Sequence, residues 1–364
     1  MANDLPPHQT GAGRLRRPKT QSESPLWCGG LIESFSGIRG IYGKGVTPDL
    51  LRRYIFCYCR MFRGKLKAVV VGGDTRPSTP FLKKTAVSTF RECGVQKIID
   101  VGAIPIQVAE YAILKFKADG GIYITASHNE PDYNGWKILK EDGALIYASQ
   151  SEKLIAAVHK LKTGGCSLSM RSHRKLTAVI NKENEAIDCY AQYVLNRLGK
   201  KAVQAIRKAR PQILVDPNGG SSVKILKKIF SLLGVPVKFV NDQPGRFSRK
   251  VEPNRESLAY LDRYLEKEQF EFAAGFDSDA DRVELVVAPQ TAFAKELGSV
   301  VSGNYVLSLA CDAMLSGTKG QVVVTNDVTA YLVRDVIKKY QAKMKEVEVG
   351  ELSLIHISEP TRPY

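Results

Sequence analysis

Short apolar runs alternate with longer amphipathic segments along most of the chain, a pattern typical of strands and helices that follow one another. Residues 67–73 and 121–125 are continuous apolar runs, as expected of strands buried on both faces of a parallel sheet. Residues 79–93 have the helical period, with Pro80 in the first turn. We therefore predict an α/β fold with right-handed crossovers and a mainly parallel sheet.

The alternation occurs in three successive series. The first has predicted strands at 67–73, 96–101 and 121–125 and helices at 79–93, 106–117 and 148–162. The second has helices at 183–199, 223–233 and about 255–268 and strands at 213–216, 236–240, 271–276 and 283–287. The third has helices at 303–316 and 328–341 and strands at 320–325 and 344–349, and it looks incomplete.

These series predict the domain boundaries. Residues 1–25 contain Pro, Gly and Ser without periodicity, so we expect a disordered lead. Residues 26–180 form a predicted first domain, which ends in a polar stretch. Residues 181–298 form a second domain, and residues 299–351 form part of a third. Residues 352–364 do not continue the pattern.

A polar segment follows the central apolar run. Ser127 comes directly after the predicted strand 121–125, where open α/β sheets keep their reactive groups. The Asn-Gly pair at 134–135 is a strong signal for a tight turn, after which residues 136–138 resume an extended pattern. For Ser127 alone, the capping of a turn is the simpler interpretation.

Three carboxylates alternate after the predicted strand 271–276. Asp277, Asp279 and Asp281 would repel one another, and proximity and burial would raise their pKa values unless a divalent cation bound them. An EF-hand is excluded, because Arg282 and Ala288 stand where that motif needs Gly and Glu. A solvated acidic turn and a phosphatase with an Asp nucleophile stay open as alternatives.

Charge and composition narrow the choice of ligands. The formal net charge of +16 suits an anionic partner, but the Lys and Arg residues are spread over many helices without an aromatic-interleaved stripe. We therefore expect a phosphorylated small substrate rather than nucleic acid. No apolar run reaches membrane-spanning length, and no secretory signal is evident. Seven scattered cysteines suggest reduced thiols and a cytoplasmic location.

Cations complete a candidate catalytic set. Arg39 lies between glycines in a predicted loop at 36–40, where its planar fork could hold a phosphate. Arg282 directly follows the acidic residues, and Lys137 could act as an acid or base if positive neighbours lowered its pKa. With Ser127 as nucleophile or phosphate carrier and Mg²⁺ on the carboxylates, these are the parts of phosphoryl transfer.

Four motifs together resemble the α-D-phosphohexomutases, particularly the phosphomannomutase/phosphoglucomutase members. They are Ser36-Gly-Ile-Arg-Gly40, Gly73-Asp-Thr-Arg-Pro-Ser78, Thr125-Ala-Ser-His-Asn129 with Asn134-Gly-Trp-Lys137, and Asp277-x-Asp-x-Asp-Arg282. The resemblance runs from about Leu31 to Gly350. It implies repeated three-layer αβα domains with mixed, mostly parallel sheets, of which the first two are complete here, the third is partial and the fourth is absent.

The resemblance also implies a reaction and its residues. A phosphoserine, here Ser127, gives its phosphoryl group to a hexose monophosphate, and a hexose bisphosphate intermediate returns the other phosphate, so that phosphate moves between C6 and C1. One Mg²⁺ is implied on Ser127 and the three carboxylates of residues 277–281. Arg39, Lys137 and Arg282 are the implied active-site cations, and the implied phosphate-binding neighbours in the serine loop are His128 and Asn129. No membrane, nucleic-acid or obligate protein partner is implied.

The chain departs from the family in its last part. It contains no Gly-Glu-x-Ser-Gly sugar-recognition motif, and residues 352–362 match the in-frame translation of a transposase sequencing adapter. We therefore expect a non-native tail at 352–364 and a polypeptide that is inactive or nearly so, although the resemblance implies that the gene encodes a mannose- or glucose-phosphate mutase. The alternative is a non-catalytic remnant that binds a phosphosugar or a divalent cation.

Overall fold

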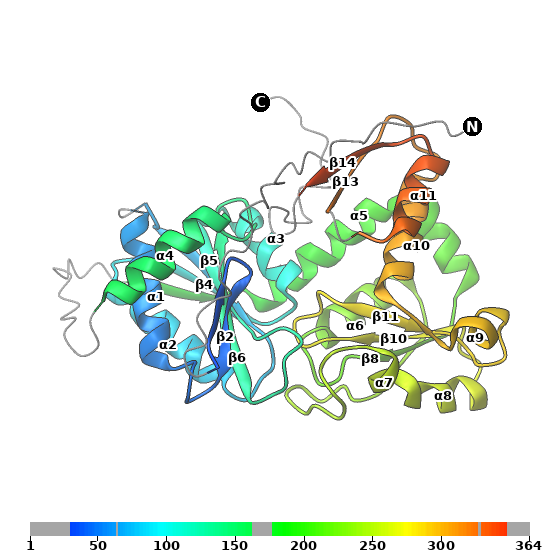
Figure 1. Cartoon of the computed structure of the whole chain (residues 1–364), viewed down its shortest axis with the longest axis horizontal. Coiled ribbons are helices and arrows are strands. Elements are labelled where there is room, and N and C mark those ends of the chain that lie inside the picture. Colours follow the sequence, from blue (N-terminus) through cyan, green and yellow to red (C-terminus); the bar gives the residue numbers. More distant parts are fainter. Residues whose placement is uncertain (1–29, 63–64, 162–176, 327–328, 348–364) are drawn as a thin grey trace, which may run out of the picture.

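The structure, a computed structural model, describes residues 30–62, 65–161, 177–326 and 329–347. The predicted lead at 1–25 and tail at 352–364 lie outside the described residues. Two α/β units stand side by side, the first drawn in blue to green and the second in green to yellow, and a smaller orange-red unit lies above the second (Figure 1). Among the described residues, no helix combines the length and apolarity that crossing a membrane requires.

The first unit is built on a seven-stranded sheet. In spatial order its strands are β1 (Ile32–Ser34), β2 (Gly37–Ile41), β6 (Tyr133–Lys140), β5 (Gly120–Ile124), β3 (Ala68–Gly73), β4 (Lys97–Ala103) and β7 (Ala178–Asn181). The four strands β5, β3, β4 and β7 are parallel, whereas β1, β2, β6 and β5 pair antiparallel. The sheet is therefore mixed, with more antiparallel pairing than the mainly parallel sheet predicted.

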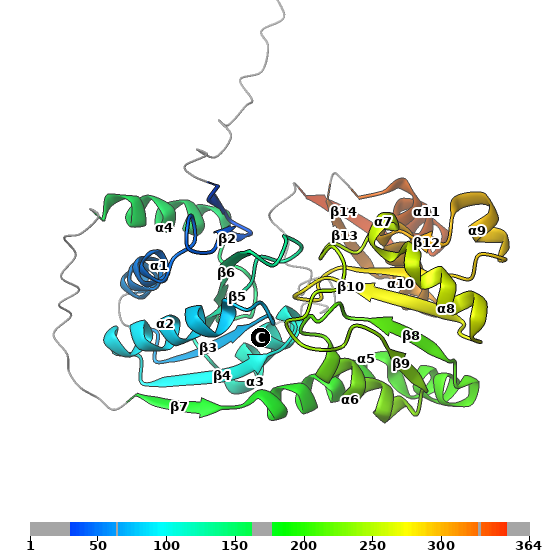
Figure 2. The same ribbon diagram turned by 90° about the horizontal axis from the view of Figure 1, so that it is seen from below.

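Helices cover both faces of this sheet. On one face lie α1 (Pro48–Met61), α2 (Thr79–Glu92) and α4 (Ala148–Lys160), which Figure 2 shows on the same side of the strands. On the other face lie α3 (Ile106–Phe116) and the start of α5 (Glu183–Ala209). Val69 and Val71 face the first core and Val70 faces the second, so β3 is buried on both sides as its continuous apolar run predicted.

The second unit repeats the layered plan on five strands. Their order is β12 (Val300–Val301), β11 (Val283–Val286), β10 (Phe272–Phe276), β8 (Ile213–Asp216) and β9 (Val237–Phe239), with β10, β8 and β9 parallel. The helices of this unit, besides the second half of α5, are α6 (Val223–Leu233) and the short helices α7 (Arg255–Leu258), α8 (Asp262–Lys267) and α9 (Ala292–Leu297). Leucines of α7 and α8 pack on one face of the sheet, and α6 and the second half of α5 pack on the other.

The third series has the predicted elements. They are α10 (Gly303–Leu315), β13 (Val322–Asn326), α11 (Tyr331–Lys339) and β14 (Lys343–Val347), with β13 and β14 paired in parallel. The core of this series is small and centres on Leu315, Val333 and Ile337.

Several local predictions were wrong. The glycine-flanked segment at 36–40 is a hairpin strand rather than a loop, and the sequence pattern did not identify α1. The helix predicted at 255–268 is broken by a 3₁₀ turn at Ala259–Leu261. Helix α5 does leave the helical conformation at Gly199, where the predicted helix ends, but the helical stretch that follows it to Ala209 was not predicted. The Asn-Gly pair at 134–135 lies inside β6, not in a turn.

Gly135 explains the misleading turn signal. It pairs with Arg39 of β2, and a Cβ atom added at Gly135 would lie 1.9 Å from the carbonyl oxygen of Ile38. This glycine is therefore needed for close approach of two strands and not for a positive φ angle.

Candidate active site

The serine loop begins where β5 ends. Ser127 is buried, with a φ of 53°, so a non-glycine residue is held in the left-handed region, which the surrounding contacts must stabilise. Its backbone N–H donates to Thr125 Oγ1 at 2.8 Å. Its hydroxyl Oγ lies 3.5 Å from Asp277 Oδ2 of the second unit. The predicted partnership between Ser127 and the acidic loop is thus present in the geometry.

Arg76 holds the serine loop from behind. Its side chain is fully buried, and its Nη2 donates to the carbonyl oxygens of Ser127 at 2.6 Å and Asn129 at 2.5 Å. Its Nη1 donates to the carbonyl oxygens of Glu130 and, at 3.1 Å, Tyr133. A single guanidinium therefore satisfies four backbone acceptors that would otherwise be buried without donors.

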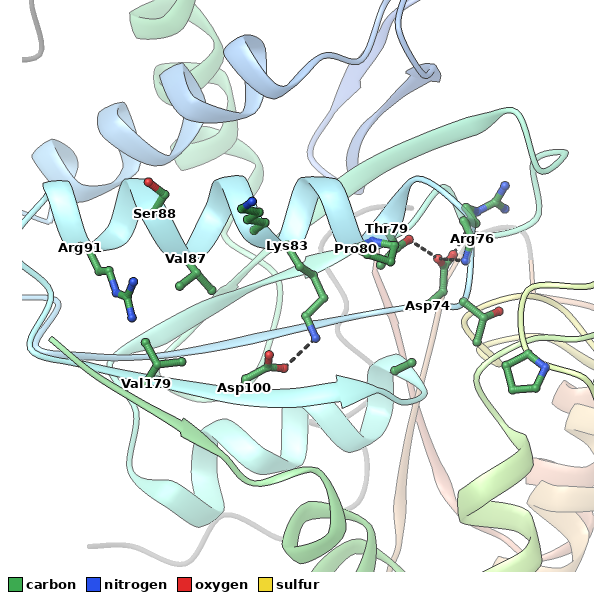
Figure 3. Close-up of a pocket in the computed structure, with 14 residues that line it drawn as sticks. Asp74, Arg76, Thr79, Pro80, Lys83, Val87, Ser88, Arg91, Asp100 and Val179 are labelled. Atoms are coloured by element: carbon green, nitrogen blue, oxygen red, sulfur yellow. Dashed lines mark hydrogen bonds and ion pairs between the residues drawn. The ribbon is translucent and has the colours of Figure 1, made fainter.

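Asp74 completes this support and connects it to the second unit. Its carboxylate pairs with Arg76 Nε at 3.0 Å and accepts the hydroxyl of Thr79 at 2.9 Å (Figure 3). Asp74 Oδ2 also accepts the hydroxyls of Thr125 at 2.8 Å and of Ser278 at 3.0 Å. One buried carboxylate thus contacts both the serine loop and the acidic loop.

The acidic loop lies between β10 and β11. One carboxylate oxygen from each of Asp277, Asp279 and Asp281 lies within 4.8 Å of the others. Asp277 and Asp279 are buried, whereas Asp281 is partly exposed. Asp279 Oδ1 is buried without a hydrogen-bond partner in the described part of the chain. Three converging oxygens and one unused buried acceptor fit a hard divalent cation.

Lys137 lies among these carboxylates. Its Nζ is 2.9 Å from Asp279 Oδ2 and 3.0 Å from Asp281 Oδ2. Burial opposes its charge, but the two carboxylates outweigh burial and raise the pKa of Lys137. The condition under which Lys137 could act as an acid or base, a pKa lowered by positive neighbours, is therefore not met, because the neighbours that contact the ammonium are anions. In this arrangement Lys137 stays protonated.

The carboxylates themselves differ. Burial, followed by the charges of Asp279 and Asp281, raises the pKa of Asp277, as predicted. For Asp279, burial acts in the same direction, but the ion pair with Lys137 overcomes it and lowers the pKa. The expectation of a raised pKa for every member was therefore wrong for Asp279.

Three other predicted site residues lie in or near the serine loop. His128 is half-buried, and burial, followed by the charge of Arg282, lowers its pKa. Arg39 lies on β2, and its Nε is buried without a partner in the described residues, as is His128 Nδ1. Arg282 pairs with Glu252 at the surface. The predicted cations Arg39 and Arg282 are thus near the loop, but neither they nor His128 contacts Ser127 directly in the described hydrogen bonds.

Asn129 has a structural contact and one unused group. Its carbonyl oxygen accepts from Arg76, and its side-chain Oδ1 is buried without a partner in the part of the chain that the structure describes. Its predicted role toward a phosphate stays a prediction.

Sequence reasoning missed three contacts that join the two units. The backbone N–H of Ile106 at the start of α3 donates to the carbonyl oxygen of Asp279 at 3.1 Å, and Gln107 Nε2 donates to that of Ala280 at 2.9 Å. Ser278, which lies between two predicted metal ligands, donates to Asp74. The alternating pattern identifies only the acidic residues of the motif. No local pattern predicts that Ser278 or Gln107 makes a contact between the two units.

Comparison with known protein families gives two matches. Residues 32–164 match the phosphoglucomutase/phosphomannomutase alpha/beta/alpha domain I, and residues 188–290 match domain II of the same family. Both matched ranges contain residues of the site described above.

Individual proteins agree with these matches. A phosphoglucomutase/phosphomannomutase of Thermococcus kodakarensis is 32% identical over 87% of this chain and 66% of its own length. A protein of Pyrococcus abyssi, named a probable phosphoglucosamine mutase, is 29% identical over 88% of this chain and 65% of its own length. The chain thus spans slightly less than two thirds of these curated relatives.

Solved structures share the fold. A phosphomannomutase-like crystal structure from Thermus thermophilus has a TM-score of 0.73 and 23% sequence identity, covering 88% of this chain and 70% of that one.

Proposed function

Because this chain belongs to the phosphoglucomutase/phosphomannomutase family of α-D-phosphohexomutases, we propose that Ser127 is its phosphoryl carrier. The observation that carries the proposal is the 3.5 Å contact between Ser127 Oγ and Asp277 Oδ2, beside two further carboxylates. A buried hydroxyl next to a cluster suited to a divalent cation is the arrangement that transfer to and from a serine oxygen needs.

The proposed reaction moves a phosphoryl group between C6 and C1 of a hexose phosphate. The bond between phosphorus and Ser127 Oγ breaks as a bond to the sugar hydroxyl oxygen forms, and the proton lost by that hydroxyl is balanced by one taken up at Ser127 Oγ. The hexose bisphosphate so formed returns its other phosphoryl group to Ser127. Of the substrates, we propose mannose or glucose phosphate; the name of the Pyrococcus relative keeps a glucosamine phosphate as a competing choice.

We propose one Mg²⁺ at the site, held by Asp277, Asp279 and Asp281 together with a phosphate oxygen on Ser127. When bound, such an ion neutralises phosphate oxygens while the P–O bond loosens. The unused Oδ1 of Asp279 supports this assignment, because a buried carboxylate oxygen without a donor is otherwise unfavourable.

The other side chains have electrostatic roles in this proposal. Lys137, which stays charged between two carboxylates, compensates their negative charge and would face the transferring group as a cation rather than as a base. Arg39, Arg282 and the loop residues His128 and Asn129 would bind phosphate oxygens of the substrate. The unused donors at Arg39 Nε and the unused ring nitrogen of His128 support this role.

Phosphorylation of the carrier is the direct test. The chain is incubated with Mg²⁺ and glucose 1,6-bisphosphate, and its intact mass is measured before and after phosphatase treatment. We expect an increase equal to one phosphoryl group, mapped by peptide analysis to Ser127 and absent from Ser127→Ala, with Ser88→Ala as the matched control. Modification at another residue, or none, would count against Ser127 as the carrier.

We further propose that the 364-residue chain by itself interconverts glucose 1-phosphate and glucose 6-phosphate slowly or not at all. The supporting observation is that the sequence contains no Gly-Glu-x-Ser-Gly motif. The same observation favours the second candidate, a non-catalytic module that binds a phosphosugar or a divalent cation. Turnover close to that of a full-length relative, measured in parallel, would overturn the inactivity; cation binding without any phosphorylation of Ser127 would favour the module.

A further inference from the structure

A groove with a volume of about 730 Å³ lies mainly on the first unit, and none of the three acidic-loop carboxylates lines it. It runs between α2 and the strands β4 and β7, and Figure 3 shows Arg91, Val87 and Lys83 projecting from α2 toward Asp100 and Val179. Cavities of this size accommodate ligands as large as a nucleotide. None of the residues assigned to phosphoryl transfer lines this groove.

The lining has more positive charge than its carboxylates can neutralise. Lys83 Nζ pairs with Asp100 at 2.6 Å. The buried carboxylate of Asp74 already pairs with Arg76 and accepts hydrogen bonds from hydroxyl groups, so it neutralises no further cation. The remaining two cations, Lys84 and Arg91, have no hydrogen-bonded or ion-paired partner among the described residues. They are therefore available to an anion in the groove.

The lining also has an apolar part. Val87, Pro80 and Ala103 contribute from the first unit, Val179 is 39% exposed on β7, and Pro244 of the second unit closes one end. An apolar wall beside unpaired cations suits a ligand that combines phosphates with a flat, largely apolar body. A bare phosphate would use only the cations.

The inner end of the groove reaches the support of the serine loop. Thr75 lines it and donates its hydroxyl to the carbonyl oxygen of Gly219, at 2.6 Å, in the second unit. Arg76 lines it as well and donates to the carbonyl oxygen of Ser127. A ligand at this end would therefore lie beside Thr75 and the junction between the two units, whereas the fully buried side chain of Arg76 is out of its reach.

We propose that this groove is a second, non-catalytic binding site for a nucleotide, with the phosphates at Lys84 and Arg91 and the base against Val87 and Val179. The inference goes beyond the proposed function and does not depend on it, because no metal ligand or carrier residue takes part.

The test is calorimetric titration of the whole chain with ADP in EDTA, so that no divalent cation occupies the acidic loop. We expect one ADP per chain. Each of Lys84→Ala and Arg91→Ala should weaken binding about tenfold, because each removes one charge-assisted hydrogen bond. Lys153→Ala on α4, which removes an equally exposed cation outside the groove, should leave the affinity unchanged.

Two further titrations locate the ligand. Asp277→Asn alters the acidic loop and should not change ADP binding; an affinity that depends on Asp277 but not on Arg91 would place ADP in the active site and overturn the proposal. Inorganic pyrophosphate should bind at least about tenfold more weakly than ADP, since it cannot contact Val87 and Val179. Equal affinities, or no ADP binding, would refute the nucleotide assignment.

Hydrogen–deuterium exchange locates the ligand independently. ADP should slow exchange in peptides from α2 and β7 in the wild-type chain and not in Arg91→Ala. Protection of other segments without any on α2 or β7 would refute the assignment.

Discussion

Replacing Arg76 with methionine removes the guanidinium and keeps most of the unbranched stem. Both Arg76 and Asp74 have no exposed side-chain surface, so the substitution leaves a carboxylate buried without its counter-charge. It also removes the side-chain donor from the carbonyl oxygens of Ser127 and Asn129. Breaking a buried pair in this way costs about 3–5 kcal/mol, a large part of the roughly 5–15 kcal/mol that stabilises a typical protein.

Trp136 makes the effect measurable in the first unit. It is fully buried, and its ring centroid lies 5.2 Å from that of Tyr54. The chain has two tryptophans, so Trp27→Phe leaves Trp136 as the only one and its fluorescence reports urea unfolding of this unit. In that background we expect Arg76→Met to lower the free energy of unfolding by at least about 3 kcal/mol.

A double substitution separates charge from packing. Asp74→Asn with Arg76→Met leaves no uncompensated buried charge, so it should be less destabilised than the sum of the two single variants. A loss below about 1 kcal/mol for Arg76→Met, or strict additivity with Asp74→Asn, would refute the view that this pair stabilises the serine loop.

Three other substitutions test separate parts of the structure. Gly135→Ala places a Cβ against the carbonyl oxygen of Ile38, so Trp136 fluorescence should report a loss of at least about 1–3 kcal/mol; an unchanged urea midpoint would show that β2 and β6 can separate freely. Ser278→Ala should weaken Mn²⁺ binding, measured by electron paramagnetic resonance, by about 10–100-fold because the acidic loop loses its bond to Asp74, and unaltered affinity would contradict this. Burial raises the pKa of Glu110 from 4.5 to about 8, so between these pH values the folded chain holds a proton that the unfolded chain releases. The free energy of unfolding should therefore fall as pH rises from about 4.5 to 8, and Glu110→Gln should make that fall less steep. An equally steep fall in the variant would refute the assignment.

The sequence predicted the layered α/β plan because strands buried on two faces need continuous apolar runs. Residues 67–73 and 121–125 were located on that basis, and β3 and β5 occupy those positions. Helix α1 escaped detection because residues 54–59 are all buried, so its apolar positions form a continuous run rather than one helical face. Strands β1 and β2 escaped because short antiparallel strands with glycine resemble a loop. At 134–135 the turn signal was misleading, since close strand contact requires glycine just as a tight turn does.

The sequence predicts those features of the candidate site that depend on residues close together in the chain. Ser127 and the acidic residues stand directly after strands, so their position at one edge follows from topology. The charge state of Lys137 did not follow, because its pKa depends on which side chains surround the ammonium. Its partner Asp279 is 142 residues away along the chain, and no spacing rule connects the two.

Asp74 shows why motifs from two units form one site. It lies 204 residues from Ser278 and 51 from Thr125, yet the same oxygen, Oδ2, accepts both hydroxyls. Phosphoryl transfer demands that the carrier oxygen and the metal ligands keep a fixed distance, and a misplacement of about 1 Å can cost a hundredfold in rate. Because the serine loop and the acidic loop belong to separate sheets, a shared buried acceptor fixes that distance more directly than the packing of either sheet can. The motif at 73–78 contains no group assigned to the reaction, and its contribution to the site is this common point of attachment.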